Sequence, residues 1–276
     1  MTVTDDSPID TLLLCGCGKM GSALLERWLE EELAENFVVV DPAPLPAQFS
    51  DNPRVKGYTA LPSTFHKDPD VVVIAVKPQI LNGVLQTFKA CGFSRSLYLS
   101  IAAGKPIRIF EDILGSQAPI VRSMPNTPAS IGRGVIAAVA NGAAQDRHKA
   151  TAGKLLRCSG MLVWLENEVL MDAVTALSGS GPAYVFLLIE SLAKAGEKLG
   201  LPPDTSMKLA RQTVIGSAAL AETLADVPAS QLRQNVTSPG GTTEAALDVL
   251  MSDAALQKLL DAALRAARDR GKALSQ

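Results

Sequence analysis

Several residue types that carry chemistry are scarce in this chain of 276 residues, which has only four cysteines and two histidines. Four cysteines are too few for a disulfide-dense scaffold, and Cys15 and Cys17 have no second ligand pair that would complete a zinc site. We therefore expect reduced thiols and no bound metal. His66 and His148 lie in polar stretches, and we expect both at the surface and not at a catalytic centre.

An excess of charge of either sign is also missing. The chain has 26 Lys and Arg against 28 Asp and Glu, a formal net charge of −2, and no basic cluster. It therefore lacks the electrostatic footprint of a protein that binds nucleic acid or an anionic membrane surface. With 47% hydrophobic and 20% charged residues, it is apolar enough to bury a sizeable core. We expect a globular protein that acts on a small molecule.

A long uninterrupted apolar run is absent as well. The longest uncharged stretch lies between Asp172 and Glu190, and the sequence Ser-Gly-Ser-Gly-Pro at residues 178–182 interrupts it. This interruption argues against a membrane span, which needs about 20 continuous apolar residues. Residues 1–6 are acidic and lack the apolar core of a secretory signal. We expect a cytoplasmic protein.

The organisation of the chain changes near residue 166. On the usual prior of about 150 residues per domain, the length predicts two domains. Before residue 166, short β-branched runs alternate with helical segments, which indicates a parallel sheet covered on both faces. After it, strand signals stop and Ala-rich and Leu-rich helical periodicity takes over, with an apolar stripe from Val185 to Leu199. We expect an α/β fold in which a Rossmann-type doubly wound parallel sheet (residues 10–166) precedes an all-α domain (residues 167–276).

Within these domains the pattern predicts individual elements. The strands are expected at residues 11–15, 37–40, 71–76, 97–101, 120–122, 134–140 and 161–164. Helices are expected at residues 20–34, between the first two strands, and at 205–224 and 253–272 in the second domain.

Residues 16–21, Gly-Cys-Gly-Lys-Met-Gly, follow an apolar strand and open a helix, which is the context of a dinucleotide-binding fingerprint. In such a loop Gly16 permits the tight turn, Gly18 lets the backbone approach a pyrophosphate, and Gly21 lets helix and strand pack closely. The helix N-terminus then receives the negative charge. The alternative is a glycine-rich turn without a ligand.

Asp41 lies 20 residues after Gly21 and closes the second predicted strand. This is the expected position of a carboxylate that binds the adenine ribose hydroxyls of NADH and repels the 2′-phosphate of NADPH. Residues 42–46 supply no Arg or Lys that could bind such a phosphate. The alternative is a strand-end aspartate that forms a turn with Pro42.

Two later strand ends carry polar residues as well. Residues 75–79, Ala-Val-Lys-Pro-Gln, end the third predicted strand, and Lys77 there is a candidate for the cofactor crevice or a solvated surface lysine. Residues 122–128 follow another strand with two prolines. That rigid loop could present the Asn126 amide to a nicotinamide or a substrate, or it could be a structural turn.

In the helical half, residues 238–244 lead into a helix that is expected to begin near Thr243. Gly240 and Gly241 let backbone N–H groups converge at a helix start, which suits a small carboxylate. The alternative is an ordinary helix entry with a capping threonine.

Taken together, these motifs give the chain a strong resemblance to the pyrroline-5-carboxylate reductase family, the enzymes of the last step of proline biosynthesis. The resemblance runs from about residue 12 to residue 270, and its most specific motifs are residues 176–184 and 235–243. It also includes residues 16–21, 75–79 and 122–129.

The resemblance implies an oxidoreductase that transfers hydride from NAD(P)H to a cyclic imine to give proline. It also implies a helical domain that intertwines in a homodimer, with the active site between the domains, and rings of dimers occur in such a family. The implied substrate-binding residues are Val236, Ser238, Gly240, Gly241, Thr242 and Thr243. Thr243 is the implied catalytic residue, because its hydroxyl would lie near the ring nitrogen.

The expected cofactor contacts combine the fingerprint with the strand ends. They are Gly16, Gly18, Lys19, Met20, Gly21, Asp41, Ala75, Val76, Lys77, Pro78 and Asn126. Two departures from the family pattern matter. Many members prefer NADPH, whereas Asp41 favours NADH, and Gln234 stands where some relatives have an acidic residue.

Other functions stay open at this point. Another imine reductase or a 3-hydroxyacid dehydrogenase would also combine these domains, but the dehydrogenase needs a catalytic lysine on a helix. Lys194 and Lys198 avoid the apolar stripe of their helix, so we expect them in solvent. A non-enzymatic NAD(P)H sensor is the third alternative. The reductase needs no catalytic histidine, because a protonated cyclic imine is already electrophilic.

Overall fold

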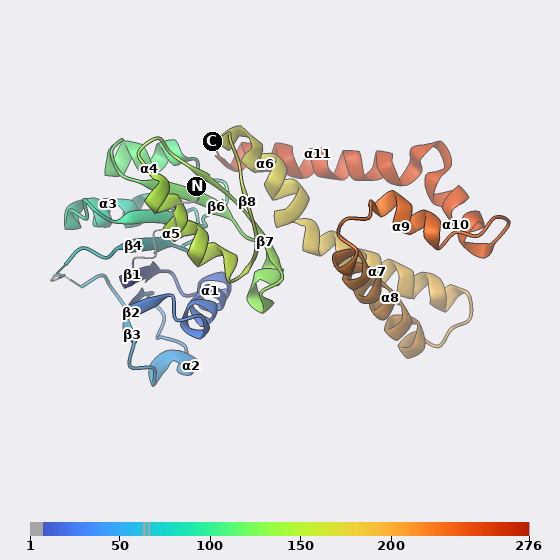
Figure 1. The fold of residues 1–276 in the computed structure, drawn as a ribbon, viewed down its shortest axis with the longest axis horizontal. Coiled ribbons are helices and arrows are strands. Elements are labelled where there is room, and N and C mark those ends of the chain that lie inside the picture. Colours follow the sequence, from blue (N-terminus) through green and yellow to red (C-terminus); the bar gives the residue numbers. More distant parts are fainter. Residues whose placement is uncertain (1–7, 63–64, 66, 276) are drawn as a thin grey trace. The chain divides into compact units, whose positions relative to one another are not determined.

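The chain, described here by a computed structural model that covers residues 8–62, 65 and 67–275, forms two compact units. The first unit extends to Gly179 and takes up the chain again from Arg268, and the second is Ser180–Ala267 (Figure 1). His66 lies outside the described residues.

The first unit contains an eight-stranded sheet with the order β3-β2-β1-β4-β5-β6-β7-β8. Its strands are β1 (Ile9–Cys15), β2 (Ala34–Val40), β3 (Val55–Tyr58), β4 (Val71–Ile74), β5 (Leu97–Ser100), β6 (Ile120–Met124), β7 (Gly134–Ala140) and β8 (Gly160–Trp164). The order reverses between β1 and β4, and this is where open α/β sheets bind ligands, at the carboxyl ends of the strands. The predicted doubly wound α/β fold is confirmed.

The sheet differs from the expected one in two places. Strand β3 was not predicted, because only Val55 of its four residues is buried and the sequence there has no apolar run. Strand β7 pairs antiparallel with β6, whereas all other neighbouring strands are parallel. The connection between them, residues 125–133, holds only a short 3₁₀ helix and is too short for a crossover, so the chain reverses.

Helices cover both faces of the sheet (Figure 1). They are α1 (Lys19–Glu30), the short α2 (Ala47–Ser50), α3 (Leu81–Cys91), α4 (Ile107–Leu114) and α5 (Asp146–Arg157). On one face the buried indole of Trp28 in α1 donates to the Leu155 carbonyl of α5 at 2.8 Å. On the other face, Phe88 of α3 and Phe110 of α4 are fully buried. The helix predicted at residues 20–34 ends earlier, since β2 already begins at Ala34.

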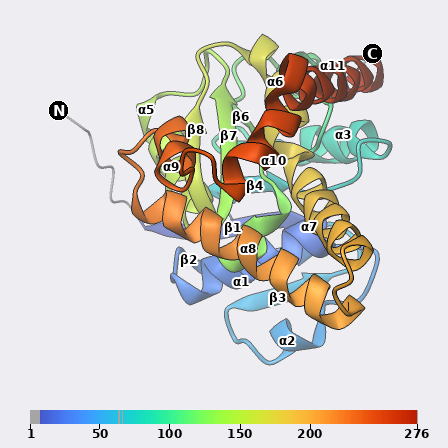
Figure 2. The same cartoon turned by 90° about the vertical axis from the view of Figure 1, so that its right-hand side faces the viewer.

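The C-terminal half is helical, as expected. Its elements are α6 (Met171–Val174), α7 (Gly181–Lys198), α8 (Pro203–Thr223), α9 (Ala229–Asn235), α10 (Thr242–Met251) and α11 (Ala255–Ser275). Within the second unit α7 and α8 lie side by side (Figures 1 and 2), and the Ser206 hydroxyl of α8 donates to the Ala193 carbonyl of α7 at 2.6 Å. The predicted helices at 205–224 and 253–272 are therefore shifted by only a few residues.

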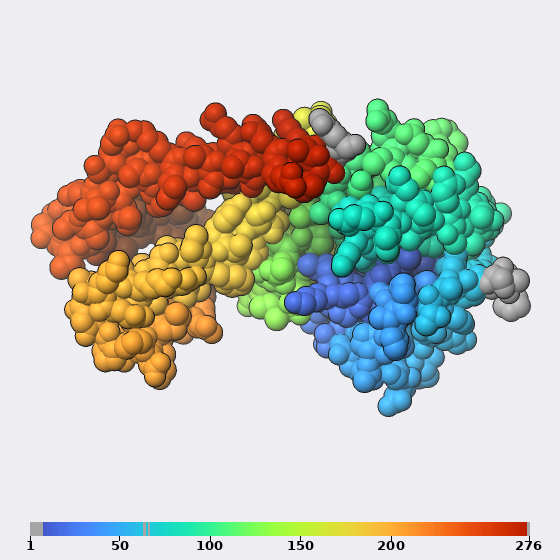
Figure 3. All heavy atoms as spheres, turned by 180° about the vertical axis from the view of Figure 1, so that it is seen from behind, coloured from blue at the N-terminus to red at the C-terminus, as the bar shows by residue number. Residues whose placement is uncertain are grey.

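One helical run, Glu168–Lys198, is long and apolar enough to cross a membrane by length and composition, with a mean hydropathy of 1.3. The expectation that residues 178–182 interrupt this run is wrong. A π-helical turn, Thr175–Gly179, leads through Ser180 into α7, and Pro182 lies in the first turn of α7, where its missing N–H breaks no hydrogen bond within α7 itself. Only 6% of the apolar window is buried, and the yellow and orange spheres of α7 and α8 lie at the surface in Figure 3.

Candidate functional site

The loop between β1 and α1 has the geometry expected of a dinucleotide fingerprint. Gly16 has φ +95°, and a side-chain carbon there would lie 2.6 Å from the Ala75 carbonyl oxygen of the neighbouring strand end. A side-chain carbon at Gly21 would overlap the Gly16 carbonyl. Both positions therefore require glycine, one for the turn and one for the close approach of helix and loop.

Gly18 differs from its neighbours because a side chain there would meet no protein atom within 4 Å. It is exposed and forms the N-cap of α1, which has no side-chain cap and no acidic residue in its first turn. The first N–H groups of a helix without such caps attract an anion. Lys19 beside it is exposed, and Met20 is half-buried. This part of the loop fits a pyrophosphate.

Asp41 at the end of β2 is tied to the fingerprint loop. Its Oδ2 accepts the backbone N–H of Cys17 at 2.7 Å, and its Oδ1 accepts that of Ala43 at 2.8 Å. The second contact is the turn that the sequence left open as an alternative. Asp41 is half-buried. Its bond to Cys17 places the carboxylate beside the fingerprint loop, in which Gly18 is exposed.

Burial lowers the reactivity of two cysteine thiols at this loop, those of Cys15 and Cys17. Burial, with a smaller contribution from the Asp41 carboxylate, raises the pKa of Cys15 to about 12 and that of Cys17 to about 11. A thiol with so high a pKa is neutral at physiological pH and is a poor nucleophile. Neither thiol is therefore activated as a nucleophile, and the Cys17 backbone N–H bonds the Asp41 carboxylate.

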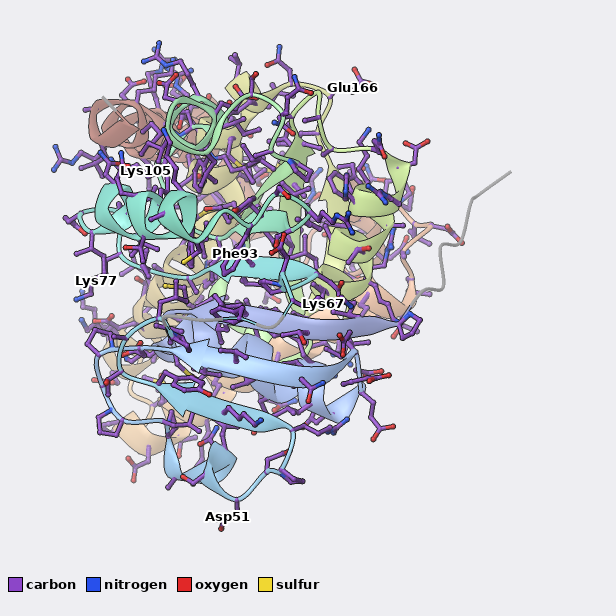
Figure 4. The ribbon with its side chains drawn as sticks, turned by 90° about the vertical axis from the view of Figure 1, so that its left-hand side faces the viewer. Asp51, Lys67, Lys77, Phe93, Lys105 and Glu166 are labelled. Atoms are coloured by element: carbon purple, nitrogen blue, oxygen red, sulfur yellow. The ribbon has the colours of Figure 1, made fainter. Side chains whose placement is uncertain are left out.

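Further candidate residues follow the neighbouring strands at the same edge of the sheet. The Ala75 N–H donates to the Cys15 carbonyl at 2.8 Å, which joins the residues after β4 to the end of β1. Lys77 is exposed, while Val76 and Pro78 are half-buried. Figure 4 shows Lys77 and Lys105 on the same side of the unit.

Lys105 was not expected as a site residue. It follows β5, the strand between β4 and β6, and comes directly after Gly104, which has φ +69°. Residues 101–106 therefore lie at the same sheet edge as the loops after β4 and β6. The Gly-Lys-Pro sequence at residues 104–106, four positions after the end of the buried strand β5, was the signal that could have identified this loop.

Asn126, after β6, is held by two hydrogen bonds within the first unit. Its Oδ1 accepts the Val135 N–H of β7 at 3.0 Å, and its Nδ2 donates to the Ser178 carbonyl of the π-helical turn at 3.1 Å. The carboxamide has one N–H left for a ligand. The structural turn that the sequence left open is therefore present.

Arg122, four residues before Asn126 in the sequence, forms an ion pair in which its own side chain is buried and the partner, Glu168, is half-buried. The Arg122 guanidinium on β6, with a side chain 6% exposed, is 2.7 Å from Glu168 Oε1. The same carboxylate oxygen accepts the Ile107 N–H at the start of α4 at 2.8 Å. Sequence reasoning missed this pair, because Arg122 and Glu168 are far apart in the chain.

The second glycine loop lies in the second unit and leads into α10. Gly240 has φ +69° and Gly241 is the N-cap of the helix. The Gly240 N–H donates to the Glu244 carboxylate at 2.6 Å, and the Gly241 N–H donates to the Ser238 carbonyl at 3.0 Å. The glycine N–H groups expected to hold a substrate carboxylate thus have acceptors from within the loop and helix.

The remaining residues of this substrate-side set lie around the same helix start. Val236 and Thr242 are exposed, whereas Thr243 is half-buried in the first turn of α10. Glu244 was missed as a contact of the loop, although an acidic residue in the first turn of a helix is a recognisable capping signal.

Three other expectations concern residues outside these loops. Lys194 is exposed and its Nζ lies 2.6 Å from Glu190 Oε1, so it is a solvated member of an ion pair. His148 is not a fully solvated residue: its Nδ1 accepts the Gln145 N–H, and burial, then Arg147, lowers its pKa. In the described ranges all four cysteines are free, and no group of His, Cys, Asp or Glu side chains has the arrangement of a metal site.

The strand order, the loop after β1 and the acid after β2 define a dinucleotide-binding oxidoreductase of the Rossmann type. Residues 11–104 match the family model described as NADP oxidoreductase, coenzyme F420-dependent, and residues 168–274 match the one described as pyrroline-5-carboxylate reductase dimerisation. The chain is 43% identical over 209 residues to the pyrroline-5-carboxylate reductase of Pseudomonas aeruginosa, covering 76% of each chain. It belongs to the pyrroline-5-carboxylate reductase family.

Solved structures agree with this assignment. The pyrroline-5-carboxylate reductase of Coxiella burnetii is similar with a TM-score of 0.88 and 34% identity, over 97% of this chain and 99% of that one. The pyrroline carboxylate reductase of Plasmodium falciparum, whose structure has NADP bound, is similar with a TM-score of 0.80 and 32% identity, over 98% of this chain and 100% of that one.

Proposed function

We propose that this protein is a pyrroline-5-carboxylate reductase, which transfers hydride from NAD(P)H to the cyclic imine and forms proline. The observation that supports it most directly is the joint presence of two loops. One is the fingerprint loop with its open Gly18, and the other is the Ser-Pro-Gly-Gly-Thr-Thr loop at the start of α10.

The cofactor supplies the hydride, and the chain's own groups hold, orient and shield the reactants. In this proposal the N–H groups at the start of α1 bind the pyrophosphate beside Gly18, together with Gly16, Lys19, Met20 and Gly21. Ala75, Val76, Lys77 and Pro78 line the cofactor from the end of β4. Asn126 adds its remaining amide N–H.

On the substrate side, Val236, Ser238, Gly240, Gly241 and Thr242 bind the carboxylate, and the Thr243 hydroxyl bonds the ring nitrogen. Because the protonated imine is already electrophilic, alignment and exclusion of water are the main requirements. Glu244 now occupies the Gly240 N–H, so a bound carboxylate would exchange with an internal one.

For the choice of cofactor we propose a preference for NADH. Asp41 is half-buried, and its carboxylate would repel a 2′-phosphate at the adenine ribose. The opposing consideration is that the Plasmodium falciparum relative was solved with NADP bound.

We also propose that residues 10–166 form the cofactor domain and that residues 167–276 form the substrate-binding and dimerisation domain. The dimerisation match to residues 168–274 supports this boundary, although the compact units themselves divide after Gly179. The apolar surface of Glu168–Lys198 would then contact a second copy of the chain in a homodimer, or a ring of dimers, and not lipid. Free cysteines support a cytoplasmic location.

The decisive experiment is an assay of the purified chain with pyrroline-5-carboxylate and either NADH or NADPH. Oxidation of the cofactor together with formation of an equal amount of proline supports the proposal. Cofactor binding without turnover on any cyclic imine would instead indicate a sensor. Light scattering at low micromolar concentration tests the assembly, because a fully active monomer is incompatible with a site shared between two chains.

A further inference from the structure

Asn126 connects three segments that are far apart in the sequence. It lies in the loop after β6, it receives the Val135 N–H of β7, and it donates to the Ser178 carbonyl. Ser178 lies in the π-helical turn Thr175–Gly179, immediately before the point at which the chain leaves the first unit.

The Ser178 carbonyl needs a donor because of Pro182. In a continuous α-helix the N–H of residue 182 would donate to the carbonyl of residue 178. Proline has no N–H, so this bond cannot form. The Asn126 Nδ2 at 3.1 Å takes the place of the missing donor. π-Helical turns are rare and concentrate at functional sites, which makes the support of this one notable.

Two more contacts hold the same helical run against β6. Glu168, at its beginning, pairs with the buried Arg122. Eleven residues further along the run, Gly179 leaves no room for a side chain, because a carbon there would lie 2.6 Å from the Met124 Cε. Arg122 and Met124 of β6 and Asn126 in the loop after it therefore all contact this run.

We propose that Asn126 is a positioning residue for hydride transfer: it replaces the hydrogen bond that Pro182 cannot donate and so fixes the turn from which α7 starts. The proposal rests on the proposed function, in which the loop of Asn126 is on the cofactor side and α7 begins the substrate-binding unit. A misplacement of about 1 Å costs on the order of 100-fold in rate when two reactants must be aligned.

The first test is Asn126→Ala, assayed for kcat and for the dissociation constant of the cofactor. We expect kcat to fall by about 10- to 100-fold, whereas the loss of the one amide N–H assigned to the cofactor, about 1 kcal/mol, should raise the dissociation constant by only about fivefold. Ser130→Ala is the matched control, because its exposed hydroxyl bonds only within the same loop. A large loss of cofactor affinity with unchanged kcat would show that Asn126 serves only as a cofactor ligand and would overturn the proposal.

The second test is Asn126→Asp, assayed between pH 8 and pH 5.5. The introduced carboxylate keeps an acceptor for the Val135 N–H but faces the Ser178 carbonyl with an oxygen. When it is protonated it donates, so we expect kcat relative to wild type to rise about tenfold as the pH falls, because a protonated carboxyl has an O–H donor. The charged groups on the elements that pack here are Arg122 with Glu168, and Arg133 before β7. A ratio that does not change with pH would contradict the role of the donor.

The third test is rescue by Pro182→Ala in the Asn126→Ala background. The substitution restores a backbone N–H at residue 182, which can donate to Ser178, so we expect at least half of the lost activity on a logarithmic scale to return. Pro182→Ala alone is the control, and rescue that exceeds its own effect is required. No rescue would contradict the proposal.

Hydrogen exchange separates this proposal from the proposed function. In the holoenzyme with NADPH, Asn126→Ala should raise exchange of the amides of residues 176–184 by about tenfold, because a lost hydrogen bond of about 1.4 kcal/mol has this effect. Ser130→Ala should leave it unchanged. If wild-type protein shows no reductase activity, the proposed function fails, whereas unchanged exchange in Asn126→Ala would contradict the positioning role itself.

Discussion

Two glycine loops in this protein lead into helices, and they are held in different ways. The first, residues 16–18, is fixed by distant parts of the chain: Gly16 donates to Val40, and Asp41 accepts from Cys17. The second, residues 238–241, is fixed by its own neighbours, since Gly241 donates to Ser238 and Gly240 to Glu244.

The comparison shows that two similar glycine sequences are held in place by different kinds of contact. A loop built into a sheet edge is already arranged before the ligand arrives, and its open position beside Gly18 is a permanent feature of the fold. In the second loop, a substrate carboxylate would first have to displace the Glu244 carboxylate from the Gly240 N–H. The first loop therefore tolerates little change, while the second should be adjustable.

Gly18→Val should have the largest effect. The side chain would fill the open space at the helix start, and we expect cofactor affinity to fall by at least about 100-fold, or about 2.7 kcal/mol, in a protein that still folds. Titration with NADH and NADPH measures this. The control is Gly83→Ala, in α3, where a side chain also meets open space. Wild-type affinity in a folded Gly18→Val protein would remove this loop from the site.

Thr243→Ala tests the second loop in turn. If its hydroxyl bonds the substrate nitrogen, the loss of about 1 to 3 kcal/mol lowers turnover by about 5- to 150-fold. Cofactor binding should be unchanged, which distinguishes this loop from the first. Thr223→Ala on α8, whose hydroxyl bonds only its own helix, is the control. Identical steady-state kinetics would place the catalytic contact elsewhere.

Asp41→Ser tests the residue that holds the first loop through the Cys17 N–H. We expect the ratio of kcat/KM for NADH over NADPH to fall by about tenfold, or about 1.4 kcal/mol, because the repulsion of the 2′-phosphate is removed. Serine also retains an acceptor for the Cys17 N–H. A wild-type preference for NADPH, or a ratio that the substitution leaves unchanged, would mean that Asp41 only forms its turn.

Glu244→Gln should have the smallest effect. Removing the charge weakens the internal competitor for the Gly240 N–H, so KM for the substrate should fall by about two- to fivefold, in keeping with the modest energies of exposed charged groups. The measurement is KM with saturating cofactor. A higher KM would show that Glu244 supports the loop and does not compete with the substrate.

Much of the first unit could be predicted because its signals are local. The apolar runs of β1 and β4 and the spacing from Gly21 to Asp41 lie within short windows, and fold and fingerprint follow from them. Strand β3 was missed because it is short and exposed, and the antiparallel β7 because its direction depends on the length of a connection.

The site was less predictable wherever a contact joins distant residues. Asn126 was identified as a polar residue in a rigid loop, but its bond to Ser178 spans 52 positions. The Arg122–Glu168 pair is hidden for the same reason. Residues 178–182 were interpreted as a break, since composition does not reveal that a π-helical turn carries the helix past a glycine-rich stretch.

The return of the chain to the first unit at Arg268 makes the helical unit an insertion and not an appendage. Both of its ends, Ser180 and Ala267, are joined to the first unit. A chain that stops after Gly179 would therefore lose part of the first unit, the final turns of α11. Replacing Ser180–Ala267 by a flexible linker would instead keep both segments of the first unit. The first unit should therefore be isolated with such an internal replacement and not by truncation.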